Sequence, residues 1–251
     1  MAAAPEPAAG PLLEVCVDSL SSARQAVSGG ADRLELCSGL SSGGLTPSPA
    51  LTRAVCALGV PVHVLIRVRE GPFQFTPDEV GLMAEELQDA AQAGAAGVVV
   101  GALAENGELD AAAMRLWAEV AAAAGLQAVC HRAFDLSADL QQSLEQLQGW
   151  GYSGVLTSGG APTALAGADQ LWHLQTQAGP HFEVLAGSGV RPGHLPELLR
   201  RSGVRAVHGS FSELRPAAED RPSLGFDLRE RCTVASQVAQ ARQTLREILG
   251  A

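Results

Sequence analysis

The sequence predicts a single-domain (β/α)8 barrel, the TIM-barrel fold, with an extra polar loop before the C-terminal helix. Three observations support this prediction. The chain has 251 residues, close to the roughly 250 that one such barrel needs. Eight short runs rich in apolar and β-branched residues recur, with starts 20 to 35 residues apart. The gaps between them carry helix-start signals, so that strands alternate with helices, as in parallel α/β folds.

The predicted strands follow one another along the chain as short buried runs. In order they are LEVCV (13–17), RLELC (33–37), VHVLI (62–66), GVVVG (97–101), LQAVCH (126–131), SGVLT (153–157), FEVLA (182–186) and RAVHG (205–209). Spacing of this size fits right-handed βα units. Eight such units favour a closed barrel over an open sheet.

Several of the intervening helices have recognisable starts. Thr46 before Pro47 and Thr76 before Pro77 each combine a capping hydroxyl with proline at the first helical position. Glu79 adds a capping box to the second of these starts. Asp110 precedes an alanine-rich segment that ends before Gly125. We therefore expect helices to begin after residues 46, 76 and 110.

The two ends of the chain differ from the repeating pattern. Residues 1–11 contain two prolines and no basic segment, so we expect a flexible tail rather than a signal peptide, followed by one domain over residues 12–251. Residues 211–228 are polar and contain proline, which predicts either a mobile loop over the barrel mouth or disorder. A last helix is expected at about residues 229–249.

Composition excludes several functional classes. A net charge of −10 argues against nucleic-acid binding, and no apolar run approaches a membrane span. Lysine is absent, which excludes Schiff-base and pyridoxal-phosphate chemistry and a Walker-type nucleotide loop in this chain. The five cysteines are scattered without a Cys-x-x-Cys motif, which indicates reduced thiols and a cytoplasmic location.

Strand parity predicts an unusually polar barrel interior. The outer face of a parallel barrel packs against helices, so its residues must be apolar and the alternate residues must point inward. The predicted inward set is Glu14, Cys16, Asp18, Arg33, Glu35, Cys37, His63, Leu65, Arg67, His131, Glu183, Leu185, His208 and Ser210. For Glu14 and Arg33, low in the barrel, we favour a self-compensating ionic cluster. Residues at the carboxyl ends of strands are candidates for a functional site.

Five sequence blocks are long and unusual: LEVCVDS (13–19), GGADRLELCSGL (29–40), GGLTP (43–47), HRAFD (131–135) and LTSGGA (156–161). In this order along the chain, they resemble the blocks of the CutC copper-homeostasis family. The resemblance implies a TIM barrel, a cytoplasmic location, self-association and a role in copper handling. It also implies a Cu(I) site at Cys16 and Cys37. The chain departs from the family pattern at Val68, Cys130 and Ser188.

The chemistry of the two cysteines permits this copper site. Thiolates are soft ligands that select Cu(I), and neighbouring strands lie about 4.8 Å apart. The alternative is that both are small, inert, buried thiols, as cysteine often is. A binding or chaperone-like module would use the same two cysteines.

A rival hypothesis is an enzyme that acts on a small anionic or phosphorylated metabolite. Glycine-rich turns after late strands often bind phosphate through backbone N–H groups; the candidates are Ser158, Gly159, Gly187, Gly189, Gly209 and Ser210. Arg67 and Arg69 are candidates for an anion clamp. The candidate catalytic residues are Glu35, Arg67, His131, Asp135 and His208, with proton transfer by His131 and Asp135 or by Glu35 and His208. Isomerase, epimerase or lyase chemistry would suit a site without lysine.

Three tryptophans on predicted helices are candidates for a self-interface. Trp117, Trp150 and Trp172 could anchor a homodimer or a larger homo-oligomer, since aromatic residues dominate interface energetics. The alternative for each is packing against the barrel.

Overall fold

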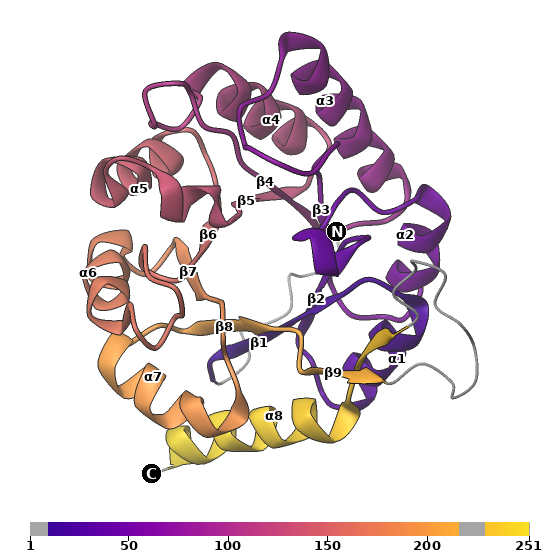
Figure 1. Ribbon diagram of the computed structural model, residues 1–251, viewed down its shortest axis with the longest axis vertical. Helices are drawn as coiled ribbons and strands as arrows, with labels where there is room; N and C mark the ends of the chain where they lie inside the picture. Colours follow the sequence, from indigo (N-terminus) through magenta and orange to yellow (C-terminus); the bar gives the residue numbers. More distant parts are fainter. Residues whose placement is uncertain (1–9, 216–228, 251) are drawn as a thin grey trace.

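The computed structural model describes residues 10–215 and 229–250 and has the predicted architecture. Eight parallel strands close into a barrel in sequence order, with helices around the outside (Figure 1). Of the predicted terminal tail and loop, residues 1–9 and 216–228 lie outside this description. The prediction of a single-domain (β/α)8 barrel is confirmed.

Strands and helices alternate from end to end. The strands of the barrel are β1 (Leu12–Val17), β2 (Arg33–Leu36), β3 (Val62–Leu65), β4 (Gly97–Val100), β5 (Gln127–Cys130), β6 (Gly154–Thr157), β7 (Glu183–Ala186) and β8 (Ala206–Gly209). The helices are α1 (Leu20–Ser28), α2 (Pro49–Cys56), α3 (Pro77–Gln92), α4 (Ala111–Ala123), α5 (Leu140–Gly149), α6 (Ala168–Ala178), α7 (Leu195–Ser202) and α8 (Ala235–Gly250). Short 3-10 helices lie at η1 (Leu40–Ser42), η2 (Arg132–Leu136) and η3 (Pro192–His194).

Parity sorts the barrel residues as predicted. Leu34 and Leu36 of β2 belong to the large apolar layer between the strands and the helices, whereas Arg33 and Glu35 make polar contacts inside. Cys130 also belongs to the outer layer, so His131 is the inward residue of that strand end. The inner apolar layer is small, because polar groups occupy much of the interior.

Helix starts follow the capping signals at two of three positions. Thr76 with Glu79 forms the capping box of α3, and Asp110 caps α4. The prediction for Thr46 is wrong: Ser48 caps α2, with Pro49 in the first turn. The Thr46 hydroxyl instead accepts from the Arg67 backbone N–H and donates to the Glu86 carboxylate, so this threonine ties the end of β3 to α3.

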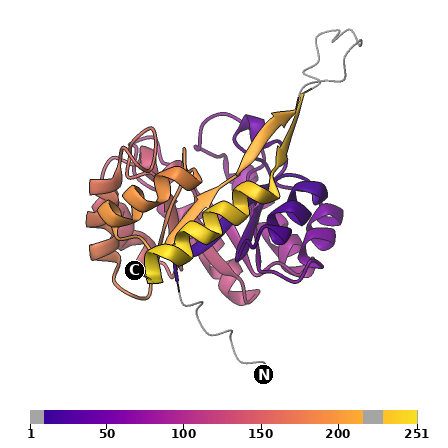
Figure 2. The same cartoon turned by 90° about the horizontal axis from the view of Figure 1, so that it is seen from below.

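The chain after β8 begins with a strand that the sequence did not predict. β9 (Ser212–Arg215) pairs antiparallel with β10 (Glu230–Thr233), and the pair extends beyond the barrel (Figure 2). The last helix therefore begins at Ala235 rather than near residue 229. Four-residue strands that pair only with each other are too short to show a clear alternation. Thr233 is buried and its backbone N–H donates to Ser22 of α1, which anchors this segment.

A buried ionic cluster fills the lower part of the barrel, as predicted for Glu14 and Arg33. The Arg33 guanidinium lies 2.5 Å from both the Glu14 and the Glu183 carboxylates. His63 lies beside it, with Nδ1 3.9 Å from Glu14, and Nε2 within hydrogen-bond distance of Gln127. The cluster spans β1, β2, β3 and β7, so it joins both halves of the barrel.

No helix in the described part of the chain is long and apolar enough to cross a membrane.

Removal of Glu14 tests the energetic role of this cluster. Glu14→Ala leaves the buried Arg33 with only Glu183 as a partner, and breaking a buried pair in this way costs about 3 to 5 kcal/mol. We expect the free energy of unfolding, measured with urea, to fall by that amount. Glu197→Ala is the control. Glu197 pairs with Arg201 at the surface, and its removal should change the free energy of unfolding by less than about 0.5 kcal/mol. Equal stability of the two variants would contradict the proposed role.

Candidate functional site

Two cysteine thiols meet at the carboxyl ends of the first two strands. Cys16 lies in β1 and Cys37 follows β2, and their sulfur atoms are 4.0 Å apart. The register pairs Cys16 with Glu35, so Cys37 lies one step further along its strand and still on the inward side. Leu65, Val99 and other apolar side chains surround the pair, and both cysteines are buried. The structure thus brings together the two cysteines that the sequence selected.

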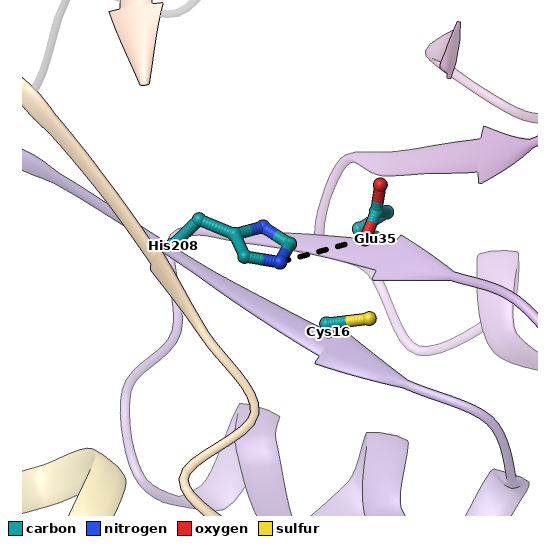
Figure 3. A group of neighbouring side chains, drawn as sticks. All are labelled: Cys16, Glu35 and His208. Carbon is teal, nitrogen blue, oxygen red and sulfur yellow. Dashed lines mark ion pairs between the residues drawn. The ribbon is translucent and has the colours of Figure 1, made fainter. Parts of the chain in front are cut away.

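A carboxylate–imidazole group lies beside these thiols. His208 of β8 has Nδ1 2.7 Å from Glu14 Oε1. Its Nε2 lies 3.6 Å from Glu35 Oε2 (Figure 3). Ligand atoms of Cys16, Glu35 and His208 all lie within 4.8 Å of one another. These residues come from the adjacent strands β8, β1 and β2, so the site exists only because the barrel closes between β8 and β1.

Burial and mutual charge set the protonation of this group. Burial opposes ionisation of Glu14, but the Arg33 charge and the hydrogen bond from His208 outweigh it and hold the Glu14 pKa well below its usual value. Burial raises the pKa of Glu35. Burial also disfavours a charged His208, but the Glu35 and Glu14 carboxylates raise its pKa overall. The Cys16 pKa is raised by the hydrogen bond with Cys37 and by burial, so the free thiol is protonated at neutral pH.

Arg67 and His131, which follow β3 and β5, form a second polar group at the mouth. The Arg67 guanidinium donates to the carbonyls of Gly44 and Gly71 and lies over the Phe73 ring, 4.8 Å from its centroid. The His131 ring contacts the same phenylalanine, with centroids 4.9 Å apart. His131 Nδ1 accepts from the Ala133 N–H. Arg67 Nε and His131 Nε2 are buried without a hydrogen-bond partner among the described residues.

Asp135 does not pair with His131, contrary to the proton-transfer pair that the sequence suggested. Its carboxylate accepts from the Thr157 hydroxyl, from the backbone N–H groups of Ser158 and Gly160, and from Arg132. Gly159 N–H donates to the Thr157 hydroxyl. The backbone N–H groups of the Ser158–Gly160 turn therefore donate to Asp135 and Thr157 and are not available to a phosphate.

Arg69 does not join Arg67 in a clamp. Its guanidinium is 2.5 Å from the Glu79 carboxylate, donates to the Gln74 carbonyl and lies over Phe75. Of the two predicted clamp residues, only Arg67 belongs to the barrel mouth. The alternation of inward and outward side chains ends with β3, and both arginines lie in the loop after it. Parity along the strand therefore could not predict that Arg67 faces the mouth and Arg69 does not.

A cavity of about 660 Å3 opens at the mouth beside the loops that follow β7 and β8. The predicted residues that line it are Cys16, Gly189, His208, Gly209 and Ser210. Arg132, Arg191 and Arg231 also line it, and the sequence analysis missed all three. Arg191 follows a glycine-rich turn, which is the signal that could have found it. Gly187 is not a lining residue; a side chain there would collide with Leu156.

A second cavity, of about 850 Å3, opens at the other end of the barrel. It is lined by residues such as Leu12, Gln127, Phe182 and Arg205, and by none of the predicted site residues. Active sites of this fold lie at the carboxyl ends of the strands. The mouth cavity, and not this larger one, is therefore the candidate site.

The fold and site define a class of protein: a TIM barrel with two buried thiols and a carboxylate–imidazole group at its mouth. Comparison with known proteins identifies the family. The profile of the CutC family matches residues 11–213. A protein of Caulobacter vibrioides named a family protein CutC is 42% identical over 243 residues, covering 94% of this chain and 98% of its own. The chain belongs to the CutC family.

Solved structures agree with this assignment. A crystal structure from Streptococcus agalactiae, described provisionally as the copper homeostasis protein CutC, has a TM-score of 0.75 and 27% identity, and the match covers 80% of this chain and 98% of that one. Tryptophan synthase subunit alpha from Legionella pneumophila is 13% identical with a TM-score of 0.61, over 94% of this chain and 93% of its own. The latter likeness shows the fold alone.

The pH dependence of stability should report the burial of His131. Burial and the Arg67 charge lower the pKa of His131 to about 3. The unfolded chain, with a histidine pKa near 6.5, therefore takes up this proton first, and stability falls as the pH drops from about 6.5 towards 3. His131 alone should cost about 2 kcal/mol between pH 7 and pH 5.

Urea unfolding of wild type and His131→Gln at both pH values measures this contribution. The variant should lose about 2 kcal/mol less than wild type between the two pH values, whatever its absolute stability. His173→Gln removes a surface histidine on α6 and should leave the wild-type pH difference unchanged. If His131→Gln lost as much stability as wild type between the two pH values, the folded wild-type protein would not be holding the His131 ring neutral.

Proposed function

We propose that this protein binds Cu(I) through the thiolates of Cys16 and Cys37 and acts in copper homeostasis. The observation that carries the proposal is the 4.0 Å separation of the two sulfur atoms. Metal–thiolate bonds of about 2.3 Å place two sulfurs on one ion roughly 3.8 to 4.6 Å apart, so the pair needs little movement to bind. Membership of the CutC family supports the assignment of this thiol pair to copper.

The surroundings of the thiols suit a soft ion. Thiolates select Cu(I), and the apolar side chains of Leu65, Val99 and Val129 pack against the two cysteines. Glu35 and His208 lie beside Cys16, but carboxylate and imidazole are harder donors than thiolate. Because both thiols must deprotonate to bind, metal affinity should fall as the pH is lowered. Cys16 also lines the mouth cavity, which provides a route for the ion to reach the pair.

Anaerobic Cu(I) titration against a competing chelator tests this proposal. Wild type should bind one Cu(I) per chain. Cys16→Ser and Cys37→Ser should each weaken binding by more than about 100-fold, since removal of a ligand exceeds the 10- to 100-fold effect of an outer-shell change.

Cys56→Ser provides the matched control. Cys56 lies half-buried on α2, away from the mouth, and its replacement should leave the affinity unchanged. Equal affinity in wild type and both mouth variants would mean that Cys16 and Cys37 are inert structural thiols.

We also propose a second candidate function, the binding of a small anionic metabolite in the mouth cavity by a lysine-independent enzyme. The observation that favours it is the set of three arginines, Arg132, Arg191 and Arg231, around the cavity of about 660 Å3. Guanidinium groups bind carboxylates and phosphates well because their donors form a planar fork. No reaction is assigned to this site.

Inorganic phosphate tests the anion site. We expect calorimetry to detect phosphate binding by wild type, and Arg191→Ala to weaken it at least about 10-fold, the effect of one lost charge-assisted hydrogen bond of about 1.5 kcal/mol. Arg53 is an exposed residue of α2, and Arg53→Ala is the control, which should bind phosphate as wild type does. The anion site would be rejected if wild type bound no phosphate, or if Arg191→Ala and Arg53→Ala bound it equally well.

A cytoplasmic location and self-association remain part of the proposal. Five free cysteines suit a reducing compartment. Trp172 on α6 is 49% exposed and is the tryptophan suited to a self-interface. Trp117 is fully buried and packs inside the subunit, with its ring N–H donating to the Val80 carbonyl, so it cannot anchor an interface.

A further inference from the structure

We propose that Cys16, Glu35 and His208 form a second metal site, for a divalent transition ion of borderline softness such as Zn2+. One sulfur, one carboxylate oxygen and one imidazole nitrogen lie within 4.8 Å of one another, and Figure 3 shows the three side chains grouped on neighbouring strands. Zn2+ in proteins takes these three donor types, commonly in tetrahedral sites. This proposal goes beyond Cu(I) binding and does not depend on it.

The spacing of the donor atoms fits one ion. Bonds of about 2.0 to 2.3 Å to a tetrahedral centre place donor atoms roughly 3.3 to 3.8 Å apart. His208 Nε2 and Glu35 Oε2 are already 3.6 Å apart. The Cys16 sulfur needs to approach by about 1 Å at most to complete the set, a change within the reach of a χ1 adjustment.

Glu14 orients the histidine for this role. Its carboxylate holds His208 Nδ1 at 2.7 Å, which leaves Nε2 directed toward Glu35. Histidines that bind metals almost always have their other ring nitrogen bonded to a carboxylate, a carbonyl or water, because this bond fixes the tautomer and the ring orientation. The Glu14–His208 pair has that arrangement before any metal binds.

The charges around Glu35 also suit a cation. Arg33 pairs with Glu14 and Glu183 but makes no ion pair with Glu35 among the described contacts. The buried Glu35 carboxylate instead faces His208 Nε2 at 3.6 Å. Metal binding requires this nitrogen to be free of its proton, so a divalent ion between Glu35 and His208 would replace that proton as the compensating positive charge.

The site has the form of an open metal centre. Cys16 and His208 line the mouth cavity, and Glu35 lies behind them and is buried. Three protein ligands with a fourth position open to a cavity are typical of catalytic zinc sites, whereas structural sites use four protein ligands. The ion would therefore be accessible to a small molecule held in the cavity.

The donor sets separate this site from the copper site. Cu(I) favours the two sulfurs of Cys16 and Cys37, whereas Zn2+ accepts the mixed set. Because both sets include Cys16, the two ions should compete, but only Cu(I) needs Cys37, and only Zn2+ needs Glu35 and His208. This difference makes the two proposals separable by mutation.

Titration with Zn2+ alone, on the copper-free protein, tests the site. Wild type should bind one Zn2+ per chain, and Glu35→Gln, His208→Gln and Cys16→Ser should each weaken binding by more than about 100-fold. Glu14→Gln removes no metal ligand but takes away the charge that orients His208 and pairs with Arg33, and it should weaken binding by about 10- to 100-fold. His173→Gln, a surface histidine on α6, should bind as wild type. Circular dichroism confirms that each variant is folded.

Cys37→Ser distinguishes the two metal proposals. It should abolish tight Cu(I) binding but weaken Zn2+ binding by less than about 100-fold, because for Zn2+ Cys37 only contacts the ligand Cys16 and is an outer-shell residue. Co2+ substitution gives a second measurement, which does not require a variant of the buried Glu35. A thiolate-to-cobalt absorption band should be present in wild type and in Cys37→Ser, and absent in Cys16→Ser.

Three results would overturn the proposal. These are no Zn2+ binding by wild type, unchanged affinity in Glu35→Gln and His208→Gln, or equal loss in Cys37→Ser and Cys16→Ser. The last result would place the divalent ion on the thiol pair. Failure of Cu(I) binding with normal Zn2+ binding would reject the copper proposal and leave this one intact.

Discussion

The interior of this barrel depends on one buried carboxylate. Glu14 accepts hydrogen bonds from Arg33 and from His208, and it lies beside His63. A carboxylate removed from water is costly unless it is compensated, and here three neighbouring strands supply the compensation. The same bonds that stabilise Glu14 fix the direction of the His208 ring. Glu14 therefore contributes both to stability low in the barrel and to the geometry of the site at its mouth.

Cys16 occupies the boundary between two sets of ligands. On one side it meets Cys37 in an apolar environment, and on the other it meets Glu35 and His208 in a charged one. A soft monovalent ion and a borderline divalent ion would use different neighbours of the same sulfur. The occupancy of the mouth would then depend on which metal is available.

The loops at the mouth divide into a rigid part and an accessible part. After β6, Asp135 binds the backbone of the Ser158–Gly160 turn and closes it upon itself. After β7 and β8, the turns leave a cavity bordered by arginines. Ser188 there has a positive φ of 80°, a conformation that costs a residue with a Cβ, and its hydroxyl donates to the Pro162 carbonyl. This part of the mouth is therefore where a small anion has room to bind.

The sequence by itself determined the barrel and the inward direction of Glu14, Cys16 and Cys37, because alternation along a strand and an apolar outer face are local properties. It also located the capping box of α3. Tertiary structure alone decided which inward residues meet. Closure between β8 and β1 brings His208 to Glu14 across 194 positions of sequence, and loop folding turns Asp135 and Arg69 toward partners that no local pattern specifies. The register of neighbouring strands and the paths of loops depend on packing across the whole barrel, so residues far apart in the chain become neighbours only in the folded protein.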